Sequence, residues 1–345
     1  MANTIQHKRG IAANWTSANP ILGAGEFGFE TDTGKLKLGD GSTAWTALGY
    51  FEPAAAVAAY SFQGENYGYT SGGFNPDSNV TDKFSFVSDG SAIDVGDLTN
   101  VMGFVAGSSS ISNGYTIGGY NLINSIDLDT IQKFPFATDA NSTNIGTLSA
   151  ASRGAAGHSS GENGYKSAGT GGSNILIEKF SLASDGNATN IGTVTIARFY
   201  VAGQSSSENG YTSGGSGNSN VIDKFPFATD ANSTDVGDLT NTTSQGSTGQ
   251  SSSENGYASG GQPGPVNIIH KFAFASDANA TDIANLTVAR TYAAGQSSTN
   301  SGYTSGGGTP SVTNVIDKFP FATDTNATDV GDLTVSRSGP AGQQY

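Results

Sequence analysis

The chain has 345 residues, of which 49 are glycine and none is cysteine, and its hydrophobic fraction is 35%. The absence of cysteine excludes a disulfide framework and thiolate metal sites, so stability must come from packing. With 15 basic against 29 acidic residues, the net charge of −14 argues against nucleic acid and anionic membranes as partners. No signal-peptide-like apolar run and no stretch of ~18 consecutive apolar residues occurs, which predicts a soluble protein made in a cytoplasm, without membrane insertion.

The first 52 residues hold both tryptophans and lie outside the repeats that follow. Segments 26–30 and 35–38 alternate apolar and polar residues on either side of a turn at 31–34, which predicts a β-hairpin. A second turn at 39–42 leads to Trp45. These residues are expected to form a small separate module.

Both tryptophans and a series of turn residues occur in one order in this module: Ile5-Gln6, Arg9-Gly10, Trp15, Asn19-Pro20, Gly25-Glu26, Gly28, Thr31-Asp32-Thr33-Gly34, Gly39-Asp40-Gly41 and Trp45. In this pattern the segment resembles the N-terminal module of bacteriophage tail fibres and tropism-determinant receptor-binding proteins. The resemblance implies a small β module, often trimeric, at the virion-proximal part of a fibre, in contact with other virion proteins. The alternative is a generic hairpin module that is also used outside phages.

After the module the chain becomes repetitive. Pro53 and the alanine-rich residues 54–59 predict a linker or the entry into the first repeat, which divides the chain into residues 1–52 and 53–345. A Gly-Tyr unit followed by small residues then occurs six times, centred on Tyr69, Tyr115, Tyr165, Tyr211, Tyr257 and Tyr303. The tyrosines are spaced by 46, 50, 46, 46 and 46 residues, a period that suits one supersecondary unit per repeat.

Each repeat is predicted to contain four short strands. In the last copy the predicted strands are 292–297, 302–305, 314–322 and 329–333, and turn-forming residues such as 324–327 separate the third from the fourth. Four short strands in about 45 residues are typical of one β-propeller blade. The fold class predicted from the repeats is therefore all-β, with six blades.

The landmarks of each repeat follow a fixed order: an Arg before strand one, Gly-Tyr, Gly-Gly, an aromatic residue on strand three and an apolar residue on strand four. In this order residues 55–345 resemble the Kelch family, which implies a six-bladed Kelch-like β-propeller. The chain departs from that pattern where Val236 and Leu239 replace the strand-four tryptophan and where Ala168-Gly169 replaces one Gly-Gly. Two segments, 59–64 and 337–344, align with strand one, and either could complete the first blade.

Acidic and amide residues recur in the turns between strands three and four. The runs are Asp139-Ala-Asn141, Asp185-Gly-Asn187, Asp230-Ala-Asn232, Asp277-Ala-Asn279 and Asp324-Thr-Asn326. Their oxygen spacing is similar to that of a calcium loop, but they lack its glycine and its terminal bidentate glutamate. Because Asx-turn chemistry explains the same residues, a structural role is favoured over calcium binding.

The sequence shows no recognisable catalytic motif. The three histidines, His7, His158 and His270, are scattered, and the aspartates recur as turn residues at repeat positions. On these grounds the chain is predicted not to be an enzyme and to need no metal or cofactor. A propeller glycosidase stays open as an alternative, because a catalytic pair of carboxyl groups leaves no sequence signature.

The two faces of the predicted propeller differ. Loops one-two and three-four are nearly identical between repeats, whereas loops two-three differ, as at Phe74–Asp77, Tyr120–Ile123 and Gln262–Pro265. Loops that vary on a fixed scaffold usually carry binding specificity. The variable face is therefore predicted to be the binding face.

Arginine and aromatic residues precede the first strands on this variable face. The candidate ligand-binding residues are Phe104, Tyr120, Arg153, Arg198, Tyr200, Arg290, Tyr292 and Arg337. Arginine beside aromatic rings suits sugars and anionic glycans through stacking and bidentate hydrogen bonds. The alternative is that each arginine lies between blades and bonds to backbone carbonyls.

Three functions follow from these observations. The first is a phage virion protein, a tail fibre or adhesin that binds a host surface glycan or protein through the variable face, assembled as a trimer through residues 1–52. The second is a capsid, nozzle or fibre decoration protein that contacts other virion proteins. The third is a glycan-cleaving propeller.

Overall fold

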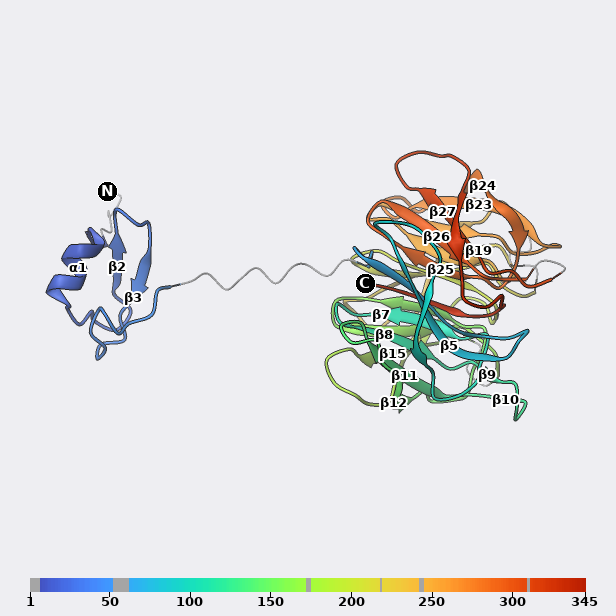
Figure 1. The fold of residues 1–345 in the computed structure, drawn as a ribbon, viewed down its shortest axis with the longest axis horizontal. Helices are drawn as coiled ribbons and strands as arrows, with labels where there is room; N and C mark the ends of the chain where they lie inside the picture. The colour runs from blue at the N-terminus through green and yellow to red at the C-terminus, as the bar shows by residue number, and fades with distance from the viewer. Residues whose placement is uncertain (1–6, 52–61, 172–174, 218, 242–244, 309–310) are drawn as a thin grey trace. The chain divides into compact units, whose positions relative to one another are not determined.

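The computed structural model describes residues 7–51, 62–171, 175–217, 219–241, 245–308 and 311–345. Two compact units make up the chain, the N-terminal unit (1–59) and a larger sheet unit (60–345) (Figure 1). The fold is all-β, as predicted: strands predominate, and one seven-residue helix occurs among the described residues. No described helix is long and apolar enough to cross a membrane.

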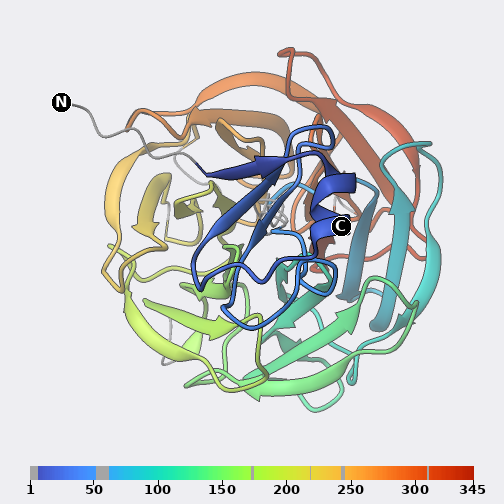
Figure 2. The same ribbon diagram turned by 90° about the vertical axis from the view of Figure 1, so that its left-hand side faces the viewer.

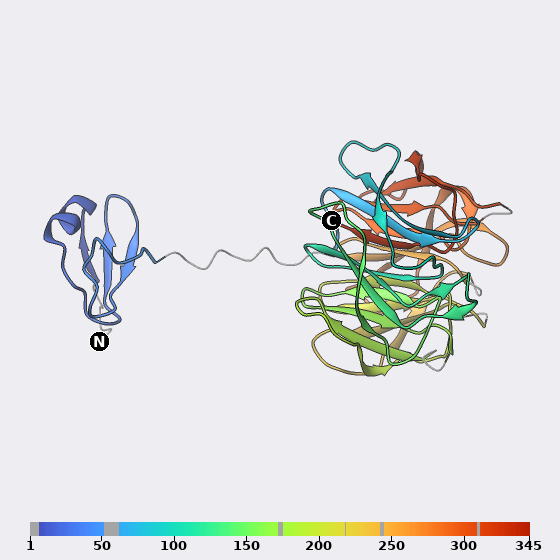
Figure 3. The same cartoon turned by 60° about the horizontal axis from the view of Figure 1, so that its bottom comes forward.

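The N-terminal unit, drawn in blue in Figure 3, contains a three-stranded sheet whose strand order is β1–β2–β3 among the described residues. β1 (Lys8–Gly10) pairs in parallel with β2 (Phe27–Glu30), and β2 pairs antiparallel with β3 (Leu36–Leu38), which confirms the predicted hairpin. The helix α1 (Ala12–Ala18) was not predicted. It ends at Asn19, whose left-handed φ of 42° forms the C-cap, and Pro20 follows.

Two stacked indole rings form the core of the N-terminal unit. Trp15 and Trp45 lie 4.2 Å apart between ring centroids with an interplanar angle of 16°, and Leu22 and Leu48 pack against them. Lys37 is buried beneath Trp45, where its Nζ donates a hydrogen bond of 2.7 Å to the Trp45 carbonyl. A buried lysine is stable only if its ammonium group is paired or hydrogen-bonded, and this contact satisfies it.

The described residues of the sheet unit form six four-stranded antiparallel sheets, which confirms the four predicted strands per repeat. The first strands are β7 (Ala106–Ser109), β13 (Ala156–Ser159), β17 (Ala202–Ser205), β21 (Thr248–Ser251), β25 (Ala294–Ser297) and β29 (Ala341–Gln344). The second strands are β4 (Tyr67–Gly73), β8 (Asn113–Ile117), β14 (Asn163–Ser167), β18 (Asn209–Ser213), β22 (Asn255–Ser259) and β26 (Ser301–Ser305).

The outer half of each sheet is formed by the third and fourth strands. The third strands are β5 (Ser78–Ser85), β11 (Thr130–Pro135), β15 (Leu176–Ser181), β19 (Val221–Pro226), β23 (Val266–Ala273) and β27 (Val315–Pro320). The fourth strands are β6 (Ile93–Asp97), β12 (Thr143–Thr147), β16 (Thr189–Thr193), β20 (Thr234–Asp238), β24 (Thr281–Arg290) and β28 (Thr328–Asp332). A short extra hairpin, β9 (Tyr120–Asn121) with β10 (Ile126–Asp127), extends the loop between β8 and β11.

Neighbouring sheets contact one another through their first strands. β7 contacts β13, and the contacts continue through β17, β21, β25 and β29 until β29 contacts β7 again. Figure 2 shows the sheets following one another in chain order around a central axis. β29 pairs with β4, so the C-terminal segment, and not residues 59–64, supplies the first strand of the sheet that contains Tyr69.

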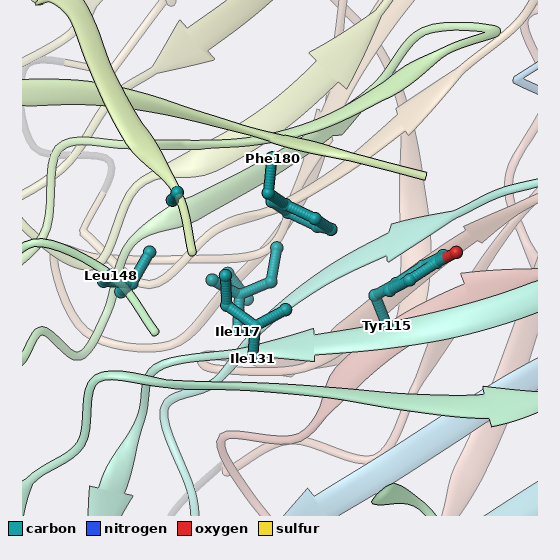
Figure 4. Packing of buried hydrophobic residues seen from close by; sticks show 7 residues of the cluster. Tyr115, Ile117, Ile131, Leu148 and Phe180 are labelled. Carbon is teal, nitrogen blue, oxygen red and sulfur yellow. The ribbon is translucent and has the colours of Figure 1, made fainter. Parts of the chain in front are cut away.

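Each sheet packs on the next through one tyrosine and the Phe-x-Phe or Phe-x-Leu pair of the following third strand. In Figure 4 this packing brings Phe180 toward Ile117, Ile131 and Leu148, and Tyr115 lies 5.6 Å from Phe180 between ring centroids. Tyr165 stacks on Phe227 at 4.7 Å in the same way. Aromatic pairs of this kind add roughly 0.5–1.5 kcal/mol each to the burial of their apolar area.

Glycine at the second position of each first strand allows the sheets to approach closely. A Cβ on Gly249 would lie 1.9 Å from the carbonyl oxygen of Gly203, and a Cβ on Gly157 would lie 2.0 Å from that of Gly107. Such distances are impossible for a real side chain, so substitution would push the sheets apart. The close approach explains why each first strand carries a glycine at this position.

A fully buried histidine replaces glutamine in one of the first strands. His158 occupies the position of Gln204, Gln250 and Gln296; its Nδ1 donates to the Gln204 carbonyl at 3.1 Å, and its Nε2 accepts from the Ser167 hydroxyl at 2.8 Å. Burial lowers the pKa of His158 to about 4. A charged imidazolium would have to donate to the Ser167 hydroxyl and would lie in an interior that cannot solvate its charge.

The buried imidazole predicts a loss of stability in acid. In the unfolded chain this histidine binds a proton near pH 6.5, whereas in the folded chain it binds one near pH 4. The free energy of unfolding should therefore fall by ~1.4 kcal/mol for each unit that the pH drops within this window. His158→Gln, which introduces the residue found at this position in four of the other five first strands, should therefore make the melting temperature less sensitive to pH between 6.5 and 4. Calorimetric scans at several pH values measure this, and an unchanged slope in the variant would contradict it.

Candidate ligand-binding site

Six residues, one immediately before each first-strand region, form a closed ring of backbone hydrogen bonds. In chain order the residues are Phe104, Gly154, Tyr200, Gly246, Tyr292 and Gly339. The carbonyl of each accepts a hydrogen bond of 2.6–2.8 Å from the amide of the next, and the Gly339 carbonyl accepts from the Phe104 amide, which closes the ring. All six have a positive φ, between 53° and 73°. Because every sheet contributes one member, the ring holds the six first strands at a common centre.

The members of this ring alternate between an aromatic residue and glycine. A Cβ on Gly154 would lie 2.6 Å from Cδ1 of Tyr200, and a Cβ on Gly246 would lie 2.6 Å from Cε1 of Tyr292. Gly154 and Gly246 therefore make room for these two tyrosine rings, whereas a Cβ on Gly339 would lie 2.7 Å from Cε1 of Phe74. Glycine adopts the left-handed conformation freely, whereas an aromatic residue held there is strained, and such strain is concentrated at functional sites.

The three aromatic side chains of the ring meet one another. Their centroids are separated by 4.9 Å for Phe104 and Tyr200, 5.5 Å for Phe104 and Tyr292, and 5.0 Å for Tyr200 and Tyr292. Phe74 lies 4.6 Å from Phe104, and Phe199 lies 4.9 Å from Tyr200. These five half-buried rings are called the channel-mouth cluster.

A cavity of about 110 Å³ lies between the first strands, with the channel-mouth cluster at one end. Its wall is formed by the small residues of the first strands, such as Gly107, Gly203 and Gly295, and Phe62 also lines it. Gln63 donates from its side chain to the Ser251 carbonyl, and Gly64 donates to the Ser297 carbonyl, at the ends of first strands β21 and β25. The chain therefore enters the sheet unit at the end of the cavity remote from the cluster.

The hairpin β9–β10 and Arg153 adjoin the cluster. The Arg153 guanidinium lies 4.2 Å above the Tyr120 ring, and its Nη1 lies 3.2 Å from Asp127 Oδ1. The Thr170 hydroxyl donates to Asp127 Oδ2 at 2.9 Å and accepts from the Arg153 amide at 3.1 Å. The hairpin is thus tied to the neighbouring sheet by a stacked and neutralised arginine.

The loops after the second strands lie on the same face as the cluster. The segments that join each fourth strand to the next first strand are called the linkers. Backbone amides at the start of three loops donate to carbonyls of these linkers: Tyr120 to Gly103, Ser216 to Phe199 and Gln262 to Gln245. The segments that differ most between repeats therefore surround the channel mouth. The nearly identical loops lie on the opposite face, where the chain enters.

Three of the predicted ligand-binding arginines do not reach this surface. Arg198, Arg290 and Arg337 are at most 1% exposed. Their guanidinium groups pair with the buried carboxylates of Asp223, Asp317 and Asp82, and they also donate to backbone carbonyls such as those of Thr212, Gly306 and Thr70. The prediction that these arginines contact a ligand is therefore corrected: they tie the linker to the third strand of the same sheet.

Arg153 differs from the other three arginines by one residue of register. It lies one residue before the ring member Gly154, whereas Arg198 lies two residues before Tyr200. A shift of one residue in extended chain turns the side chain to the other side, so Arg153 keeps a side-chain exposure of 30%. Counting back from the Ala-Gly of each first strand would have shown this difference in the sequence.

The site carries little charge. Burial raises the pKa of Tyr200 and of Tyr292, so both hydroxyls stay protonated at neutral pH. The Tyr292 hydroxyl accepts a hydrogen bond of 3.1 Å from the Gln245 amide. The arrangement can stack on a flat apolar surface and exchange hydrogen bonds through hydroxyl and amide groups.

The acidic and amide turns have a different role. Six Lys–Asp pairs, 2.5–2.9 Å long, join each third strand to the turn of the next sheet: Lys83–Asp139, Lys133–Asp185, Lys179–Asp230, Lys224–Asp277, Lys271–Asp324 and Lys318–Asp89. Asn232 accepts a bond of 3.1 Å from the Thr193 amide across the same boundary. Across the described residues, no group of three or more His, Asp or Glu side chains could hold a metal ion. These contacts support the structural role of the turns.

Comparison with known proteins finds relatives of the N-terminal unit. Residues 5–43 match the family model of the major tropism determinant N-terminal domain, which confirms the resemblance to a phage tropism module. A protein named hyaluronoglucosaminidase from Streptococcus pyogenes phage H10403 is 47% identical over 49 residues, or 14% of each chain. One of the same name from phage H4489A is 48% identical over 46 residues, or 13% of this chain and 12% of that protein.

These names correct one prediction. The sequence predicted that the chain is not an enzyme, and this prediction is wrong, because both relatives bear the name of an enzyme. The prediction rested on the lack of a recognisable motif, and a pair of catalytic carboxyl groups produces none. The shared segment spans about one seventh of those relatives, so their activity is not transferred to this chain by the match itself.

Burial of the arginines predicts a large effect on stability. Arg290→Ala leaves Asp317 as an unpaired buried carboxylate and should lower the free energy of unfolding by ~3–5 kcal/mol. Arg153→Ala removes a half-exposed partner and should cost about 1 kcal/mol or less. Denaturant titration of both variants compares their free energies of unfolding. If both substitutions lower it equally and by a small amount, the Arg290–Asp317 pair does not stabilise the sheet as stated.

Proposed function

We propose that the chain is a phage tail-associated receptor-binding protein whose sheet unit is a six-bladed Kelch-like β-propeller. The match of residues 5–43 to a tropism-determinant domain supports a virion component. The cyclic contacts between first strands and the closed ring of hydrogen bonds support the propeller arrangement. A host surface glycan or protein binds at the channel mouth in this proposal.

One observation carries the choice of face. The channel-mouth cluster presents five half-buried rings, surrounded by the loops that differ most between repeats. The chain enters at the opposite face, through Phe62 and Gly64. The cluster therefore lies on the face opposite the one where the described chain enters the sheet unit, and we assign receptor binding to the face with the cluster.

Residues 1–52 serve in this proposal as the attachment to other virion proteins and as the contact that forms a trimer. Large apolar side chains are exposed on this small unit, among them Ile21 at 57% and Phe51 at 50%. A unit of this size buries little core alone, so sharing these side chains between subunits would stabilise it. Light scattering that reports the same oligomer for a chain beginning at residue 53 would refute this assignment.

Adsorption to host cells tests the binding face. Glycine already occupies every second position of the hydrogen-bonded backbone ring. Replacing Tyr200 and Tyr292 by glycine should therefore leave this ring intact. The double variant should lose adsorption by tenfold or more, because a few aromatic anchors dominate most interfaces. The matched control is Glu208→Ala on the opposite face, which should leave adsorption unchanged. If the control abolishes adsorption and the tyrosine variant does not, the wrong face has been chosen.

A second candidate function is glycan cleavage, favoured by the names of the two matched phage relatives. Asp127 is a carboxylate that the contacts place beside the channel-mouth cluster. If this function holds, the full-length protein should release reducing ends from hyaluronan. Asp127→Asn should then reduce the rate by at least about a hundredfold, because a general acid or base usually contributes that much to the rate. Undetectable release by the wild-type protein would leave receptor binding as the better account.

A further inference from the structure

The charges on the channel-mouth face are few and largely cancelled. The loops after the second strands and the linkers before the first strands contain seven charged residues: Asp77, Asp127, Asp129, Arg153, Arg198, Arg290 and Arg337. Three of the four arginines are buried against Asp82, Asp223 and Asp317. Arg153 is therefore the remaining cation of this face.

Arg153 is itself neutralised. Its Nη1 lies 3.2 Å from Asp127, and the Tyr120 ring covers its guanidinium at 4.2 Å. An anionic ligand would have to displace Asp127, whose second carboxylate oxygen is held by the Thr170 hydroxyl at 2.9 Å. Asp77, exposed in the loop after β4, adds a further negative charge to the face. An acidic ligand would meet no uncompensated cation here and would be repelled by the net charge of −14.

The remaining groups of the site suit a neutral ring. The channel-mouth cluster offers aromatic surface, and the Tyr200 and Tyr292 hydroxyls with the Gln245 amide offer hydrogen bonds without charge. The C–H face of a sugar ring packs on aromatic rings, and its hydroxyl groups pair with such donors and acceptors. Building on the receptor-binding function proposed above, we propose that the channel mouth binds uncharged sugar rings of a neutral polysaccharide and that Asp127 excludes acidic glycans.

The inference makes Asp127 a specificity-determining residue. Removing its charge would release the Arg153 guanidinium, which then faces the ligand as an unpaired cation. Asp127→Asn should therefore gain affinity for acidic polysaccharides while the aromatic surface that binds neutral rings stays in place. Asp139→Asn is the matched control, since it makes the same change in net charge and frees Lys83 on the opposite face.

The test measures binding of the full-length protein to immobilised neutral polysaccharides (dextran, mannan, galactan) and acidic ones (hyaluronan, polygalacturonate). The wild-type protein should bind a neutral polymer with less than about a twofold change between low and high salt, because no charge pair forms. Tyr200→Gly should weaken this binding about tenfold or more. Asp127→Asn should acquire salt-sensitive binding to an acidic polymer that neither the wild-type protein nor Asp139→Asn shows.

Two outcomes would overturn the inference and leave the proposed function intact. One is salt-sensitive binding of the wild-type protein to an acidic polymer that Tyr200→Gly abolishes. The other is binding to no polymer while host adsorption still depends on Tyr200, which would indicate a protein receptor. Failure of the proposed function itself would look different: adsorption to host cells would be unaffected by Tyr200→Gly, whatever the polysaccharides show.

Discussion

The sheet unit depends on six backbone hydrogen bonds that close on themselves around its centre. Each joins ring members of neighbouring sheets, and all six residues need the left-handed conformation. The glycines at the second position of the first strands allow the sheets to approach closely enough for this ring to form. Farther from the centre, tyrosine stacking and the six Lys–Asp pairs join the same neighbours. Each repeat thus contacts its neighbours in three places, at increasing distance from the centre: the backbone ring, the tyrosine stack and the Lys–Asp pair.

The same ring explains how a repetitive scaffold acquires an individual site. Positions that only close the ring accept glycine, and Gly154, Gly246 and Gly339 occupy three of them. The intervening positions carry Phe104, Tyr200 and Tyr292. Tyr200 and Tyr292 fill the space that Gly154 and Gly246 leave open, and Phe74 fills the space beside Gly339. Three substitutions on a uniform backbone therefore create an aromatic surface, and the loops around it supply its borders.

Much of the fold could be predicted from the sequence, because each repeat buries the same side chains in the same register. The six tyrosines marked the second strands, and alternation in segments 26–30 and 35–38 marked the N-terminal hairpin. The short helix Ala12–Ala18 was missed because it is too brief to show a helical period. The site was only partly predictable. Arginines at similar places looked equivalent, although one residue of register separates the exposed Arg153 from the buried Arg198. The pairing of Arg153 with Asp127 joins separate repeats and leaves no local pattern in the chain.

The central claim is that a ligand binds at the channel mouth, on the face opposite the entry of the chain. Hydrogen–deuterium exchange of the full-length protein, with and without a saturating polysaccharide ligand, tests it directly. Residues 98–105, 194–201 and 286–293, together with the hairpin β9–β10, should exchange more slowly in the complex. Protection confined to the loops between first and second strands, such as the one that contains Glu208, would contradict the account.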